Sequence, residues 1–143
     1  MGSTNLVSVE QPPDVFLGGT CNGSQWRESL KPLLTATFFD PVVPEWNAEA
    51  QAREVKAREE SKYVVYTLTP KMTGVYSVAE VVDDSNKRPE KTVLLVLEED
   101  GDAKFTEHQI KSLNQVKKLV AANGGKVASS LEEVATLLNA ESA

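Results

Sequence analysis

Two short apolar segments constrain the fold of this chain more than any other feature of its sequence. They are YVVYTL, residues 63–68, and TVLLVL, residues 92–97. A strand that is apolar at nearly every position, and not only at every second one, is typical of a strand buried on both faces of its sheet. Each segment lies between stretches with helical periodicity, and this alternation predicts a parallel sheet with helices on both faces.

Further strands and helices alternate along the chain in the same way. Three more short strands are predicted at residues 15–17, 37–39 and 126–127. The predicted helices span residues 25–34 (with Pro32 ending or kinking the helix early), 47–60, 75–84 and 106–122, and a last one follows Ser130. With right-handed crossovers, these elements predict one doubly wound α/β domain with a five-stranded parallel sheet, flavodoxin-like or Rossmann-like, over residues 14–143. Residues 1–13 are expected to form a flexible polar leader.

Side-chain signals support these helix boundaries. Three helices begin at residues that can accept hydrogen bonds from the free N–H groups of a first turn: Asn47, Thr106 with Gln109, and Ser130 with Glu133. Within helix 47–60, two i,i+4 ion pairs are expected in the favourable order: Glu49 with Arg53, and Glu54 with Arg58.

Composition excludes several classes of function. The net charge of −6 argues against binding of nucleic acid polymers. Cys21 is the only cysteine, so no intrachain disulfide can form, and a cytoplasmic location is expected. His108 is the only histidine, which excludes a zinc site built from several Cys and His residues, and no metal or other cofactor is expected. No apolar run approaches the roughly 20 residues of a membrane span, so no membrane association is expected.

The loops after the first three strands are where chemistry is expected. In doubly wound sheets, ligands bind beyond the carboxyl ends of the strands, at the point where the strand order reverses. The three loops read GGTCNGS, DPVVPEW and TPKMTG. In the first, glycines let backbone N–H groups approach a ligand, and the following helix start favours an anion. Its spacing matches neither G-x-G-x-x-G nor a Walker A loop, so a ligand site and a well-capped turn fit this loop equally well.

Glu80 is the carboxylate best placed to reach this crevice. It lies in the second turn of the helix predicted at 75–84, whose apolar stripe, predicted to face the sheet, consists of Val75, Val78, Ala79 and Val82. Glu80 falls beside the stripe, on a flank with Tyr76 and Asp83. By spacing alone, a solvated helix glutamate is the commoner explanation.

Three other features have simple explanations. Cys21 is expected to be a buried or merely neighbouring cysteine, because the only histidine, a possible base, lies far away in sequence. His108 is expected at the surface, and the acidic tract LEEDGD is expected to form a solvated turn.

Taken in order, the motifs of this chain resemble the nucleoside 2-deoxyribosyltransferase-like family. They are FLGGT, FFDP, SKYVVYTLTP, a TG followed by five residues and a glutamate, and TVLLVL, and together they span about residues 14–127. The resemblance implies a protein that cleaves or transfers at the N-glycosidic bond of a nucleoside or deoxynucleoside. Two alternatives stay open: a 2′-deoxynucleoside 5′-monophosphate N-hydrolase, and a non-catalytic nucleotide-binding module of the same fold.

The resemblance also implies roles for individual residues. In the family, a glutamate on the helix after the third strand attacks the anomeric carbon, and Glu80 matches it. Glu54 is the nearest match to a second acid that helps to position the base, and Tyr76 would shield the nucleophile. From the resemblance, contacts with the sugar and base are expected from Gly18, Gly19 and Thr20, and contacts with a 5′-phosphate from Asn22, Gly23, Ser24 and Arg27. Further contacts are expected from Asp40, Asp83 and Trp46. Trp46 can stack on a planar ligand, although a tryptophan that partly fills a crevice wall is the commoner case.

One departure from the family pattern concerns the loop TPKMTG. The family often has an aspartate six residues before the catalytic glutamate, and Gly74 stands at that position here. The group that assists the leaving base must then come from elsewhere, or the chain is the non-catalytic module. Active sites of the family can be completed by a neighbouring subunit, so the resemblance allows a homo-oligomer.

Overall fold

The structure, a computed structural model, describes residues 12–21, 23–42 and 47–142. Most of the predicted leader, residues 1–11, lies outside the described residues, as do two predicted substrate contacts, Asn22 and Trp46.

Five parallel strands form the central sheet. They are β1 Val15–Gly19, β2 Phe38–Phe39, β3 Tyr63–Leu68, β4 Thr92–Val96 and β7 Lys126–Ala128. Their order across the sheet is β2-β1-β3-β4-β7, and every neighbouring pair is parallel. This is the order of flavodoxin-like doubly wound sheets, in which the direction of strand addition reverses between β1 and β3. The predicted fold class is confirmed.

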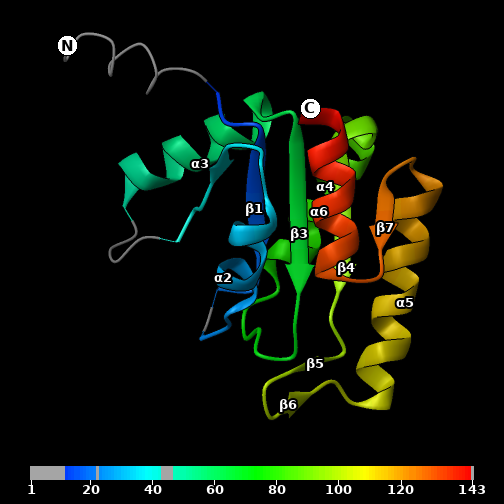
Figure 1. The fold of residues 1–143 in the computed structure, drawn as a ribbon. Helices are drawn as coiled ribbons and strands as arrows, with labels where there is room; N and C mark the ends of the chain where they lie inside the picture. Colours follow the sequence, from blue (N-terminus) through cyan, green and yellow to red (C-terminus); the bar gives the residue numbers. More distant parts are fainter. Residues whose placement is uncertain (1–11, 22, 43–46, 143) are drawn as a thin grey trace, which may run out of the picture.

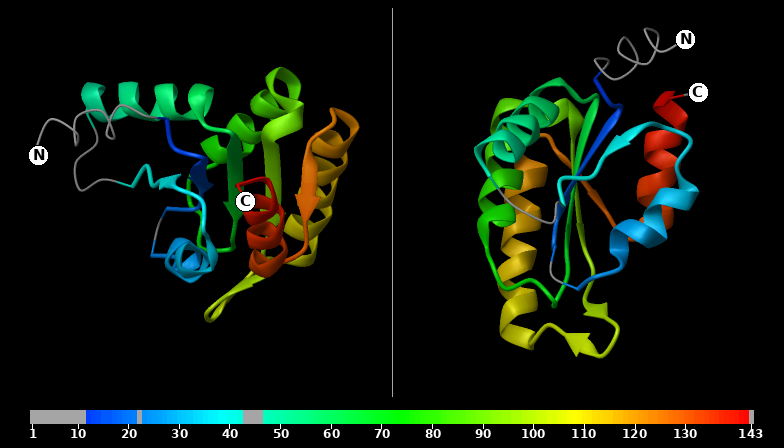
Figure 2. Two further views of the ribbon diagram at one scale, coloured as in Figure 1. Left: turned by 45° about the horizontal axis from the view of Figure 1, so that its top comes forward. Right: turned by 90° about the vertical axis from the view of Figure 1, so that its left-hand side faces the viewer.

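Helices cover both faces of this sheet. They are α2 Trp26–Leu30, α3 Ala48–Glu60, α4 Tyr76–Lys87, α5 Glu107–Ala122 and α6 Leu131–Ser142. Figure 2 shows α2 and α6 on one face of the sheet and α3, α4 and α5 on the other. A small antiparallel hairpin, β5 Glu99–Asp100 with β6 Ala103–Lys104, extends beyond the carboxyl ends of the strands (Figure 1). No helix within the described ranges has the length and apolar character needed to cross a membrane.

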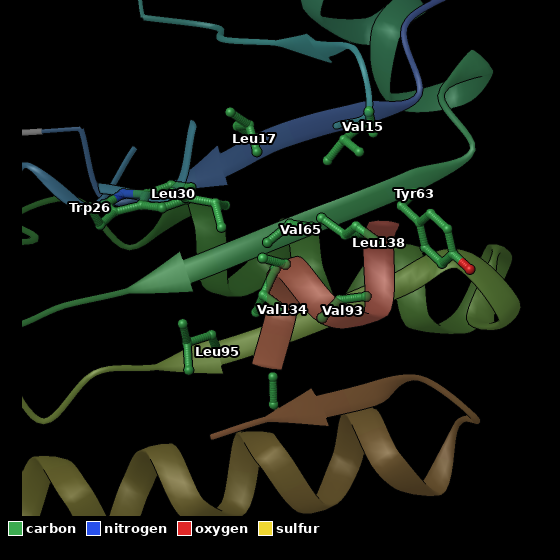
Figure 3. Packing of buried hydrophobic residues seen from close by; sticks show 13 residues of the cluster. Val15, Leu17, Trp26, Leu30, Tyr63, Val65, Val93, Leu95, Val134 and Leu138 are labelled. Atoms are coloured by element: carbon green, nitrogen blue, oxygen red, sulfur yellow. The ribbon is translucent and has the colours of Figure 1, made fainter. Parts of the chain in front are cut away.

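The apolar strands supply side chains to two separate cores. One core, between the sheet and the helices α2 and α6, is shown in Figure 3 and includes Leu17, Trp26, Val65, Leu95, Val134 and Leu138. The other lies beneath α3, α4 and α5 and includes Phe16, Val64, Tyr66, Leu94, Val81 and Val120. Because successive strand residues enter opposite cores, polar residues are disfavoured on both faces, which explains the continuous apolar segments.

The helix predicted at residues 25–34 is shorter in the structure. The α-helix ends at Leu30, and a single 3₁₀ turn, Lys31–Leu33, follows it. Pro32 accounts for the change, because its ring clashes with the preceding turn and it has no N–H to donate. The other predicted boundaries agree within a few residues, and the predicted caps form: Asn47 accepts from the Ala50 N–H at 2.8 Å, and Thr106 with Gln109 forms a capping box.

The prediction that the apolar stripe of α4 faces the sheet is wrong. Val75 is 72% exposed, while Val81 and Asp84 are fully buried. Val78 and Val82 are partly buried in the core beneath α5, and with α5 they line a groove of about 700 Å³. The helix packs against both the sheet and α5, so its apolar stripe lies along the seam with α5, and Glu80, Asp84 and Ser85 are buried with Val81.

The close packing at the end of β1 can be tested by a substitution at Gly19. Its φ is +116°, and a Cβ added there would lie 2.1 Å from the carbonyl oxygen of Thr67. We expect Gly19→Ala to lower the free energy of unfolding by at least about 2 kcal/mol, measured by urea denaturation, because backbone strain and the steric clash add. Gly74→Ala is the control: nothing lies within 4 Å of its added Cβ, and a change below about 0.5 kcal/mol is expected. Equal effects of the two substitutions would contradict this packing argument.

Candidate active site

A cavity of about 530 Å³ lies beside the end of β1, next to the point where the strand order reverses. Its walls come from the end of β1 and the start of α2, the loop after β2, one side of α3, and the first turns of α4. Six residues predicted from sequence line it: Gly18, Gly19, Arg27, Glu54, Tyr76 and Glu80. Ligands of doubly wound sheets bind at this position.

Glu80 is nearly buried, with 7% of its surface exposed. Burial, and then the negative charge of Glu54, raise the pKa of Glu80 to about 7. A positive charge opposes this shift, because Nη1 of Arg58 lies 3.4 Å from Oε2 of Glu80. The side chain is therefore a shielded carboxyl group that can exchange its proton near neutral pH.

Glu54 faces Glu80 from α3. Ala50 and Ala57 are buried on the inner side of this helix, and Glu54, at i+4 from Ala50, is half-buried on the same side. Burial raises the pKa of Glu54, although its hydrogen bond with Glu80 and the charge of Arg58 act in the opposite direction. Two carboxyl groups this close titrate as a pair, so one is ionised while the other still holds a proton.

A fully buried carboxylate, Asp84, holds Arg58 in place. Nη2 of Arg58 donates to Oδ1 of Asp84 at 3.0 Å, and the hydroxyl of Tyr66 donates to Oδ2 at 2.6 Å. Arg88 also donates to Oδ1. The i,i+4 ion pair predicted between Glu54 and Arg58 is replaced by other pairs. Arg58 lies within ion-pair distance of Glu80, Asp83 and Asp84.

The donors of Arg27 are directed to the protein backbone. The side chain is buried, its Nε donates to the carbonyl oxygen of Leu17 at 3.0 Å, and its Nη1 donates to that of Thr20 at 2.6 Å. Asp40 lies 3.6 Å from the same Nε. Arg27 therefore ties the end of β1 to α2, although part of it lines the cavity.

Five other predicted contacts lie outside the cavity lining. Thr20 is buried, and its Oγ1 accepts from the Thr69 N–H at 2.9 Å. Asp40 pairs with Lys31 at 2.8 Å, and Asp83 pairs with Lys87 at 3.1 Å. The remaining two, Gly23 and Ser24, contact loops that follow β3 and β4.

Several lining residues were not predicted as site residues. They are Cys21, Pro41, Val42, Gln51, Val55, Arg58 and Ser77. Of the two alternatives expected for Cys21, burial is wrong, because the residue is exposed and lines the cavity. For Gln51, Val55 and Arg58, the helical period that places Glu54 inward was the available signal, since residues three and four apart share a side of the helix. No group of three His, Cys, Asp or Glu residues able to hold a metal ion occurs in the part of the chain that the structure describes.

The fold and this cavity define a class of protein: a doubly wound α/β protein with a shielded carboxyl pair beside a glycine-ended first strand. The sequence profile of the family described as "nucleoside 2-deoxyribosyltransferase like" matches residues 12–100. The chain belongs to this family, and the match includes all residues that line the cavity. Comparisons with curated proteins and with solved structures give no match.

The raised pKa of Glu80 predicts a pH-dependent stability. The folded protein holds this proton up to about pH 7, whereas a glutamate with the ordinary pKa of 4.5 releases it earlier. The resulting stabilisation is complete below pH 4.5 and is lost as the pH rises through 7. Between pH 5 and pH 8, we expect the free energy of unfolding of the wild type to fall by about 2–3 kcal/mol relative to that of Glu80→Gln. Urea denaturation at both pH values measures this difference.

Glu132→Gln, at an exposed position on α6, is the control and should follow the wild-type pH dependence. Identical pH profiles for the wild type and Glu80→Gln would contradict the raised pKa of Glu80.

Asp84 accepts hydrogen bonds from Arg58, Tyr66 and Arg88, and we call these contacts the Asp84 network. Removal of its carboxylate is expected to cause a large loss of stability. Asp84→Ala leaves two guanidinium groups and the Tyr66 hydroxyl without their acceptor. We expect the free energy of unfolding to fall by about 3 kcal/mol or more. The neighbouring Asp83→Ala is the control, with an expected change below about 1 kcal/mol, because its side chain is 45% exposed. Similar losses for the two variants would show that the buried network is not special.

Proposed function

We propose that the protein cleaves or transfers at the N-glycosidic bond of a nucleoside, with Glu80 as the nucleophile. The observation that carries this proposal is the carboxyl pair of Glu80 and Glu54, shielded in a cavity of about 530 Å³ and accompanied by the fixed guanidinium group of Arg58. Cleavage of such a bond gives the sugar oxocarbenium character, and a nearby carboxylate can capture the anomeric carbon as a covalent glycosyl ester. Membership of the nucleoside 2-deoxyribosyltransferase-like family supports the same chemistry.

In the first step, an ionised oxygen of Glu80 bonds to the anomeric carbon while the bond to the base nitrogen breaks. The electron pair of that bond leaves with the base, and protonated Glu54 donates its proton to it. In the free site the shared proton rests on Glu80, so it passes to Glu54 before the attack. Arg58, 3.4 Å from Glu80, stabilises the carboxylate that this transfer leaves on Glu80. Glu54 thereby takes the part of the acid that the loop TPKMTG lacks.

In the second step, water or a new base attacks the anomeric carbon and the ester bond to Glu80 breaks. Glu54, now ionised, removes the proton of the attacking group. Two displacements at one carbon give overall retention of configuration. Water as the acceptor gives hydrolysis, and a base gives transfer.

The cavity favours a nucleoside over its 5′-monophosphate. Among the described residues that line it, the cationic side chains are Arg27 and Arg58. Arg27 directs its donors to backbone carbonyls, and Arg58 directs its donors to the carboxylates of α4. A phosphate requires charge-assisted donors that are free to meet it, so a neutral 5′-hydroxyl suits these walls better. Pro41, Val42 and Val55 provide an apolar surface on which a planar base can stack.

A panel of nucleosides and their 5′-monophosphates, incubated with and without an acceptor base, tests the proposal through base release measured by chromatography. Release from nucleosides is expected, and exchange that depends on the acceptor identifies transfer. Release from monophosphates alone would support the N-hydrolase alternative. Binding without turnover would support the non-catalytic module and overturn the enzyme proposal.

The assignment of Glu80 has its own test in the same assay. We expect Glu80→Gln and Glu80→Ala to lower kcat by at least about 1,000-fold, because the carboxylate oxygen that would form the glycosyl ester is lost. Neither variant opens a large core cavity, and the far-UV circular dichroism spectrum should match that of the wild type. The control, Glu132→Gln on the opposite face of the sheet, should keep wild-type kcat. An active Glu80→Ala protein refutes the assigned nucleophile.

A further inference from the structure

The hairpin of β5 and β6 contacts the loop after β1 and the loop after β3, at the carboxyl ends of the strands. The tract LEEDGD, expected to be a solvated turn, forms much of this hairpin, and only 14% of the Asp100 side chain is exposed. Oγ of Ser24 donates a hydrogen bond of 2.6 Å to Oδ2 of Asp100. Nζ of Lys71, in the loop after β3, lies 3.9 Å from Oδ1 of the same carboxylate.

Lys71 closes this arrangement into a three-way contact. Its Nζ donates a hydrogen bond of 3.3 Å to the carbonyl oxygen of Gly23, next to Ser24. The loops after β1, β3 and β4 thus meet at one carboxylate. We call the contacts among Ser24, Lys71 and Asp100 the Asp100 clasp.

The chain that follows β1 is held at two places. The clasp holds it at Gly23 and Ser24, and a separate set of hydrogen bonds holds it at Thr20. At Thr20, the backbone N–H donates to the carbonyl oxygen of Thr67 at 2.9 Å, and Oγ1 accepts from Thr69. The indole of Trp26 also donates to the carbonyl oxygen of Thr20, at 2.8 Å. Cys21 lies between these anchors and lines the cavity, so the clasp helps to set the position of this wall.

We propose that Asp100 is a positioning residue for the substrate cavity. Through Ser24, it holds the wall that contains Cys21 in the conformation that receives a nucleoside. A hydrogen bond to a charged acceptor is stronger than one between neutral groups. The bond from Ser24 to Asp100 therefore orders the chain around Cys21 more than an exposed pair such as Lys104 with Glu99 does. Glu80 is held by Arg58, and Arg58 is held by Asp84, none of which belongs to the clasp. Loss of the clasp therefore weakens substrate binding and spares the chemical step.

The first test measures local order and does not depend on activity. Amide hydrogen exchange, followed by NMR, is compared between the wild type and Asp100→Ala at Cys21, Ser24 and Trp26, whose N–H donates to Oγ of Ser24. We expect exchange about tenfold faster in the variant, the change that corresponds to loss of one hydrogen bond. Asp102→Ala, an exposed acid in the same turn, is the control and should exchange as the wild type does.

Two more variants separate the clasp from a general loss of folding. Ser24→Ala should accelerate exchange as Asp100→Ala does, and the double variant should add little, because both remove one interaction. Asp100→Asn retains an oxygen acceptor for Ser24 and should recover most of the protection. Unchanged exchange in Asp100→Ala, or full additivity in the double variant, overturns the proposal.

The second test rests on the proposed function. With a nucleoside substrate, we expect Asp100→Ala to raise KM about tenfold and to change kcat less than about twofold. A fall in kcat with unchanged KM overturns the positioning role. If the wild type turns over no nucleoside, the proposed function fails, while the exchange experiment still decides whether the clasp orders the loop.

Discussion

The buried carboxylate of Asp84 is the interaction on which the rest of the site depends. It receives hydrogen bonds from Tyr66 on β3, from Arg58 on α3 and from Arg88 just after α4, so it joins three consecutive elements of the chain. A lone charge in this position would be costly, but a fully hydrogen-bonded one fixes geometry. Arg58 is thereby held as a stationary cation between α3 and α4. Without this cation, ionisation of both members of the Glu54–Glu80 pair would be still less favourable.

The cavity places an electrostatically unfavourable carboxyl pair, Glu54 and Glu80, on a tightly packed sheet. Strands β1, β3 and β4 are packed on both faces, and the hydrogen bonds of Asp84 join β3 to α3 and α4. The carboxyl pair above this support is unfavourable when fully ionised, as the raised pKa of Glu80 shows. Such local instability is common where a protein needs a reactive group, because burial makes a carboxylate more responsive to a developing positive charge. The residues that line the cavity all lie within the family match, residues 12–100.

Local sequence patterns predicted the fold well and the site only in part. The apolar segments at 63–68 and 92–97 specify strands buried on both faces, and caps such as Asn47 depend on residues close in sequence. The two glutamates were assigned through the family resemblance, and the structure brings them together. The orientation of α4 was missed because an apolar stripe does not reveal whether its neighbour is the sheet or α5. Contacts between distant residues, such as Ser24 with Asp100, leave no local signal at either position.

The family match ends at residue 100, but the sheet does not. Strand β4 has β3 on one side and β7 on the other, and α5 and α6 help to bury its two faces. During synthesis, the segment TVLLVL leaves the ribosome before any of these later elements. Until they arrive, it presents an uncharged strand edge of the kind that pairs with other chains. The residues after 100 thus complete the cover of β4, and any exchange of this region must supply an equivalent cover.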